Sequence, residues 1–252
     1  MPEASETASL AAEAYTTVRQ RILRGELTMG QVISRRKLAS ELGMSFLPVS
    51  EALLRLEFEG LLESRPRAGT RVRIPTFQDV QGHYIVREAL EVQAARLFAN
   101  AATPEEKAEL QRLAVRVDLM AAQPEADRYH YLSLHEKLHR RVAECARCAT
   151  LSDAIEKTHA LASTWMCVAR QGGQSEPRRT HQDLAEALNS GNPELAGAAM
   201  RRHILSSLER AFERLKPYFQ LSKARGATYS RSAKKRRDES ALLDPATQPS
   251  AE

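Results

Sequence analysis

Residues 35–60 read RRKLASELGMSFLPVSEALLRLEFEG, and this stretch decides the fold of the N-terminal third of the chain. Its apolar residues recur at helical intervals on both sides of Gly43, which predicts helices over 35–42 and 49–59 with a turn over 44–48. A helix, a tight turn that contains glycine and a second helix form the helix-turn-helix arrangement of DNA-binding proteins.

The flanking segments extend this unit on both sides. Before it, the apolar spacing predicts a helix over 10–24. After it, residues 61–74 read LLESRPRAGTRVRI, two strand-like runs around a turn that contains proline and glycine, which predicts a β-hairpin. We therefore expect a winged helix-turn-helix domain over residues 10–75, preceded by a flexible N-terminus over 1–9.

From residue 76 onward the strand signals stop and helical periodicity continues. Proline and glycine separate six predicted helices, which span residues 77–100, 104–122, 126–146, 149–170, 177–190 and 193–218. The sequence thus predicts a mainly α protein, with a C-terminal six-helix bundle over 76–221. The polar, basic stretch over 222–252 is expected to be a disordered tail.

Composition excludes several protein classes. The 252 residues suit two domains, the sequence shows neither a membrane-spanning run nor an apolar signal core, and three cysteines cannot form a disulfide framework. We therefore expect a cytoplasmic protein. The net charge of +5 is unevenly placed: residues 1–75 carry 11 basic and 9 acidic side chains, residues 76–221 carry 19 of each, and the tail carries 7 against 4. A polyanionic partner should bind the N-terminal domain and the tail.

At this point the chain resembles a known family. The runs VRQRILRGEL, RKLASELGMS, PVSEALLRLEFEGLLE and RAGTRV, which lie between residues 18 and 72, resemble the winged helix-turn-helix of GntR-family bacterial transcription regulators. VREALE at 86–91, HxxxH at 135–139, THQDLAEAL at 180–188 and MRRHI at 200–204 resemble the FCD (FadR C-terminal domain) effector module. The resemblance covers residues 10–218 and implies a homodimeric, effector-controlled repressor or activator that binds a DNA operator and is not an enzyme.

The second helix of the helix-turn-helix is the one that enters the major groove. The family usually carries two arginines near the start of this helix, where this chain has Phe46 and Ser50. Because Phe46 can contact a thymine methyl group and Ser50 can bond several bases, we expect an operator unlike the usual GntR consensus. Phe46 could instead pack on the preceding helix. Ser45 is expected to cap the recognition helix.

Basic side chains should hold the DNA backbone. Arg36 matches an arginine of the family, and Arg65, Arg67, Arg71 and Arg73 alternate, which predicts one cationic face of the wing; a solvated charged hairpin is the alternative. Gly69 permits close backbone approach. The predicted DNA-binding residues are Arg35, Arg36, Ser45, Phe46, Ser50, Arg65, Arg67, Gly69 and Thr70.

Four histidines correspond to the metal-ligand positions of the FCD pattern: His135, His139, His181 and His203. His135 and His139 are four residues apart and so share one face of a helix. His135 stands where the family has an aspartate, and an all-imidazole set favours zinc, with nickel or copper next. The alternative is that these are ordinary surface or core histidines, which is the interpretation we give to His83, His130 and His159.

The sequence is also compatible with two other functions. Residues 135–139 read HEKLH and match the H-E-x-x-H helix of zinc hydrolases, in which Glu136 would be the general base and Glu144 or Glu156 a third ligand. The family pattern instead places two further histidines where a catalytic water would bind. The second rival is an architectural DNA-binding protein without an effector.

Arg87 corresponds to the family position that faces the effector pocket. A guanidinium binds a carboxylate through two hydrogen bonds, so the resemblance implies a small organic acid as effector. A pair with Glu91 within the same helix is the structural alternative and is compatible with that role. Cys145 and Cys148 form a single C-x-x-C motif, for which inert thiols are the simplest interpretation.

Overall fold

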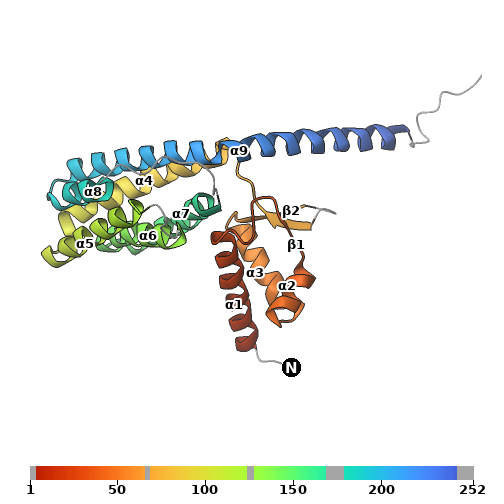
Figure 1. Cartoon of the computed structure of the whole chain (residues 1–252), viewed down its shortest axis with the longest axis horizontal. Helices are drawn as coiled ribbons and strands as arrows, with labels where there is room; N and C mark the ends of the chain where they lie inside the picture. The colour runs from red at the N-terminus through yellow and green to blue at the C-terminus, as the bar shows by residue number, and fades with distance from the viewer. Residues whose placement is uncertain (1–3, 66–68, 124–127, 169–178, 243–252) are drawn as a thin grey trace, which may run out of the picture.

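The computed structural model describes residues 4–65, 69–123, 128–168 and 179–242. The first elements are α1 (Ala4–Leu23), β1 (Val32–Ile33), α2 (Arg35–Leu42), α3 (Phe46–Phe58), β2 (Leu62–Arg65) and β3 (Gly69–Val72). They are followed by α4 (Phe77–Ala101), α5 (Pro104–Ala121), α6 (Arg128–Cys145), α7 (Ala149–Val168), α8 (Thr180–Asn189) and α9 (Pro193–Leu242). Figure 1 shows the first group as a small domain beneath the elongated helical domain.

The N-terminal domain is a winged helix-turn-helix, as predicted. Ser34 caps α2 by accepting a hydrogen bond from the Lys37 amide, and Gly43 ends α2 in the left-handed conformation at φ +64°. Helix α3 begins at Phe46, three residues earlier than predicted. Backbone amides in the first turn of a helix have no acceptor within the helix, so proline, which lacks the amide hydrogen, is tolerated there. Pro48 therefore lies inside the first turn of α3.

The wing is a three-stranded antiparallel sheet in the order β1-β3-β2, in which Glu63 pairs with Arg71 and Val32 also pairs with Arg71 from the other side. The sequence predicted β2 and β3 only. Strand β1 has two residues, too few for an alternating pattern to be visible in the sequence.

The helical domain contains the six predicted helices, and α4 and α9 run antiparallel along its length (Figure 1). Capping boxes formed by Thr76 with Asp79 and by Thr103 with Glu106 begin α4 and α5. Buried apolar side chains from several helices form one core, to which Phe98, Leu110, Leu138, Leu188 and Ile204 belong. None of the helices in the described ranges combines the length and the apolar character that crossing a membrane requires.

Both ends of the chain are more helical than predicted. Helix α9 passes through Pro217 and continues to Leu242, although we expected it to end at Tyr218 and the tail to lack regular structure. Helix α1 begins at Ala4, inside the stretch that was expected to be flexible. Neither extension has an apolar repeat: residues 4–9 are mostly alanine, serine and threonine, and residues 219–242 are rich in lysine and arginine, which have good helix propensity. Residues 243–252 lie outside the described part.

The two domains share a contact through α7. Leu161 packs against the apolar core of the helical domain and also against that of the N-terminal domain. A Cβ atom placed on Gly60, just after α3, would lie 3.7 Å from Leu161 Cδ2. The end of the recognition helix therefore touches a helix of the C-terminal domain.

Candidate functional site

Three of the predicted metal ligands converge in the helical domain. The Nε2 atom of His139 on α6 lies 3.3 Å from Nε2 of His135 and 3.2 Å from Nε2 of His203 on α9. Tetrahedral zinc with Zn–N bonds of 2.0–2.1 Å places neighbouring nitrogens about 3.3 Å apart. All three side chains are buried. The spacing and the donor type fit a transition metal.

The fourth predicted histidine lies beside these three. The ring centroid of His181 on α8 is 5.0 Å from that of His135 and 5.1 Å from that of His203. Its Nδ1 atom lies 2.6 Å from an Asp118 oxygen, and the same carboxylate accepts hydrogen bonds from the backbone amides of His181 and Gln182. A histidine anchored through Nδ1 to a carboxylate has Nε2 left for coordination, an arrangement common around bound metals.

A second carboxylate supports His139. Glu91 on α4 has one oxygen 2.5 Å from His139 Nδ1, and its other oxygen lies 3.0 Å from His159 Nε2 and 2.8 Å from Arg87 Nε. All four side chains are buried. His159 on α7 is a core histidine, in agreement with its interpretation from sequence, and it is part of this buried polar network. Neither Asp118 nor this role of Glu91 was predicted.

The environment keeps the imidazoles neutral. Burial, partly opposed by the Glu91 charge, lowers the pKa of His139 to about 4, and burial together with His139 holds the pKa values of His135 and His203 well below the usual 6.5. Burial disfavours ionised Glu91, but the Arg87 guanidinium and His159 outweigh it and hold the pKa of Glu91 well below its usual value. Neutral imidazole is the form that binds metals.

Glu91, His139 and His159 also lie close enough together to hold a cation. The Arg87 guanidinium lies beside this group of side chains. It donates a hydrogen bond to Glu91, and its Nη2 atom is 3.3 Å from His159 Nε2. A fixed positive charge at that distance repels a second cation. We therefore interpret Glu91, Arg87 and His159 as the residues that orient the His139 ring, and not as part of a second metal site.

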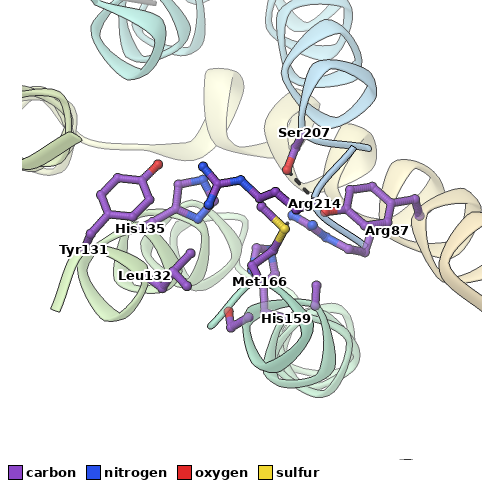
Figure 2. A pocket seen from close by; sticks show the side chains of 11 residues that line it. Arg87, Tyr131, Leu132, His135, His159, Met166, Ser207 and Arg214 are labelled. Atoms are coloured by element: carbon purple, nitrogen blue, oxygen red, sulfur yellow. Dashed lines mark hydrogen bonds between the residues drawn. The ribbon is translucent and has the colours of Figure 1, made fainter. Parts of the chain in front are cut away.

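A pocket with an empty volume of about 430 Å³, counting its open mouth, adjoins the histidine cluster (Figure 2). Its walls include Tyr84, Arg87, Tyr131, Leu132, His135, His159, Ala162, Ser163, Met166, Ser207 and Arg214. The sequence suggested that Arg87 faces a pocket or pairs with Glu91. In the structure it does both. Arg214 of α9 was not predicted, and its Nε atom is buried without a hydrogen-bond partner.

The glutamates that the hydrolase hypothesis requires do not join the histidine cluster. The groups of potential ligands in the described ranges contain none of Glu136, Glu144 and Glu156, and none of the three lines the pocket. Cys145 is buried, and burial raises the pKa of its thiol to about 11, so it is not a reactive thiolate at neutral pH.

Among the predicted DNA-binding residues of α2 and α3, some side chains are exposed and others make hydrogen bonds within the domain. Phe46 is 56% exposed, and Arg36 is exposed as well. Ser50 Oγ donates to the Phe46 carbonyl at 2.8 Å and is left as an acceptor for bases. Ser45 is the N-cap residue of α3, as predicted, although its side chain makes no capping hydrogen bond. Arg35 donates to Thr70 Oγ1 and joins α2 to the wing.

The wing is less cationic than predicted. Strand register places Glu63 on the same face as Arg65 and Arg71, and Glu63 pairs with both, at 3.4 and 2.7 Å. Arg73 pairs with Asp79 at the start of α4. Gly69 is exposed with φ +74°, a conformation that favours glycine. Arg67 lies outside the described residues.

Comparisons with known proteins agree with this architecture. The model of bacterial regulatory proteins of the gntR family matches residues 10–72, and the FCD domain model matches residues 83–206. The "Probable D-xylose utilization operon transcriptional repressor" of Paenarthrobacter nicotinovorans is 32% identical over 191 residues, which cover 74% of this chain and 82% of that protein. The HTH-type transcriptional repressor RspR of Escherichia coli is 23% identical over 192 residues, 75% of this chain and 83% of that repressor.

Solved structures show the same fold. E. coli McbR/YncC superposes with a TM-score of 0.68 at 20% identity, covering 81% of this chain and 98% of that one. A GntR regulator from Rhodococcus sp. RHA1 gives a TM-score of 0.66 at 20% identity, with the same coverage. A winged helix-turn-helix followed by an FCD domain, with relatives that are regulators and not enzymes, identifies the chain as a member of the GntR family of DNA-binding transcription regulators.

Proposed function

We propose that this regulator is a repressor that binds a two-fold symmetric operator as a homodimer, and that a divalent transition metal and a small carboxylate metabolite in the helical domain control its affinity for DNA. The observation that carries the proposal is the convergence of the His135, His139 and His203 Nε2 atoms beside a pocket that contains Arg87.

His135, His139, His181 and His203 would hold the metal, with zinc the best fit to four imidazoles. When bound, it would supply a Lewis-acid centre for an anionic oxygen of the effector. Glu91 and Asp118 hold the rings of His139 and His181 through Nδ1. Because the four histidines come from α6, α8 and α9, the metal would also join three helices.

The pocket favours a hydroxylated carboxylate. Arg87 and Arg214 offer guanidinium groups to an anion, and Tyr131, Ser163 and Ser207 offer hydroxyl groups to hydroxyls of the ligand. The relative named for a D-xylose utilization operon adds sugars and sugar acids to the classes worth testing.

Helix α7 connects the pocket to the DNA-binding domain. His159, Ala162 and Ser163 line the pocket, and Leu161 on the same helix packs into the core of the N-terminal domain beside Gly60. A ligand that shifts α7 would therefore move the contact at the end of α3. Two sites acting on one element in this way is what allosteric control of DNA affinity requires.

An outer face of α4 supports dimerisation. Between Gln81 and Gln93 every exposed residue of α4 is uncharged, and Ile85 and Val86 are 61% and 48% exposed. An uncharged, partly apolar helix face suits a self-complementary contact around a two-fold axis. Light scattering should give a dimer for the native chain and a monomer for Ile85→Arg.

The proposal is tested by metal analysis of the purified protein followed by thermal-shift screening of carboxylates and sugars with and without zinc. We expect bound transition metal, and a hydroxy acid that raises the melting temperature in the metal-loaded protein and changes operator affinity. Absence of metal with no uptake of added zinc would remove the metal. A footprint that no metabolite alters would support an architectural DNA-binding role.

A further inference from the structure

Most exposed side chains of α3 are large and apolar, although a DNA-reading helix is expected to be polar there. Its exposed positions are Phe46, Leu47, Glu51, Leu54, Arg55 and Phe58, with Ser50 partly exposed between them. Phe46, Leu47 and Leu54 are 56%, 58% and 65% exposed. Exposed large apolar side chains gathered on one face are informative because they mark surfaces that bind a partner.

The basic residue of α3 is turned toward α1. Helix α3 contains a single cation, Arg55. Its Nε atom lies 3.2 Å from Glu59, and its guanidinium lies 4.0 Å above the ring of Tyr15 on α1. Arg55 is thus directed to the α1 side of the domain, so guanine recognition through a paired guanidinium has no donor on α3.

The neighbouring helix α2 carries exposed cations. Arg36 and Lys37 on α2 are exposed, and the side chain of Lys37 is 78% exposed despite a 3.8 Å pair with Glu41. Basic side chains of the helix that precedes the recognition helix are placed to meet phosphates, and the N-terminal turn of the recognition helix meets base edges. DNA satisfies both features, since its phosphates match the cations and its major groove exposes one apolar group, the thymine methyl.

We infer that Phe46 and Leu47, continued by Leu54, read thymine methyl groups, so that the operator half-site is specified by thymines and not by guanines facing α3. Ser50 adds an acceptor between them, because its hydroxyl hydrogen is held by the Phe46 carbonyl. This inference rests on DNA binding through α3 and deepens the proposed function by naming the base class that is read.

The test begins with selection of an operator from a random duplex library by the full-length protein. Each thymine of the operator is then replaced by uracil, which lacks only the methyl group, and each guanine by 7-deazaguanine, which lacks the N7 acceptor. We expect affinity, measured by fluorescence anisotropy, to fall about four-fold for each methyl that is read. The 7-deazaguanine substitutions under α3 should leave it unchanged.

Variants assign the effect to residues. Phe46→Ala and Leu47→Ala should bind the thymine operator more weakly and lose the difference between thymine and uracil. Leu119→Ala is the matched control, since Leu119 is 61% exposed but lies on α5 of the helical domain. Equal binding of thymine and uracil operators, or methyl sensitivity that survives in both variants, would overturn the inference while DNA binding stands. Failure to enrich any sequence would instead overturn sequence-specific DNA binding itself, and the inference with it.

Discussion

The outer face of α3 and the interior of the helical domain invert the usual distribution of side chains. Helix α3 exposes phenylalanine and leucine to solvent, whereas the helical domain buries Arg87, Glu91 and five histidines at its centre. Both arrangements cost stability by themselves, since exposed apolar surface is not removed from water and buried charge loses its hydration. Each therefore indicates a region whose residues serve binding more than folding.

The two regions also differ in how their side chains are held. Inside the helical domain, Arg87, Glu91, His139 and His159 form a closed network of short contacts. On α3, the large apolar side chains are exposed to solvent and are available to contact a binding partner. Substitutions on α3 should therefore affect recognition, whereas substitutions in the interior of the helical domain should affect both folding and ligand binding.

The largest effect should follow removal of the buried carboxylate. Glu91→Ala leaves the Arg87 guanidinium buried without its counter-ion, and we expect a loss of about 3–5 kcal/mol in the free energy of unfolding. Urea denaturation measures this change. The control is Glu194→Ala, which breaks the exposed pair with Arg96 and should cost at most about 0.5 kcal/mol. Similar losses in the two variants would show that the buried network is not a special feature.

Next in size is the effect of Asp118 on metal binding. Asp118→Asn keeps all four rings but weakens the hold on His181 Nδ1, and we expect metal affinity to fall about 10- to 100-fold. Competition with a chromophoric zinc chelator measures the affinity. His130→Ala, an exposed histidine of α6, is the control and should bind as the native chain does. Unchanged affinity in Asp118→Asn would contradict a metal bound through His181.

A smaller effect concerns communication between the regions. Leu161→Ala removes the side chain of α7 that packs against both cores, which Met29 also contacts from the N-terminal domain. Operator affinity without effector should therefore change little, while the change caused by effector should shrink. Typical coupling free energies are about 1–3 kcal/mol, and we expect at least half to be lost. Leu151→Ala is the control, because Leu151 lies on the same helix but packs only against the helical-domain core. Full coupling in Leu161→Ala would exclude this route.

The smallest effect should come from exposed charge beside α3. Arg36→Ala should weaken binding to all DNA sequences and lower the slope of log affinity against log salt by about 1. Arg67→Ala in the wing should act in the same direction. Arg201→Ala, whose side chain pairs with Glu88 on the helical domain, should leave the slope unchanged. A native slope in Arg36→Ala would show that Arg36 does not contact phosphate.

Local sequence signals predicted most of the fold. The bounds of α2 were predicted to the residue, because Gly43 ends that helix in the left-handed conformation. The six helices of the C-terminal domain followed from proline and glycine at their boundaries. Strand β1 and the extension of α9 were missed, the first because it is short and the second because its sequence has helix propensity but little apolar content.

The candidate site was predicted only in part. The four histidines could be selected because the spacing of HxxxH and the two later motifs resembles a family pattern, and the structure brings them together. Asp118, His159 and Arg214 carry no such signal. Asp118 contacts His181, and His159 contacts Glu91, each across two different helices. One sequence gives no information on which distant side chains will meet.

The amino-acid sequence by itself thus determined the order of the two domains, their helical segments and the types of residue able to bind DNA and metal. Tertiary structure alone decided which charges remain available. Glu63 meets Arg65 and Arg71 across the wing, and Tyr15 and Glu59 hold Arg55, whereas Phe46 and Leu47 stay exposed. The physical reason is that helix and turn propensities act between residues a few positions apart, while charge pairing and burial depend on distances in space between segments remote in sequence.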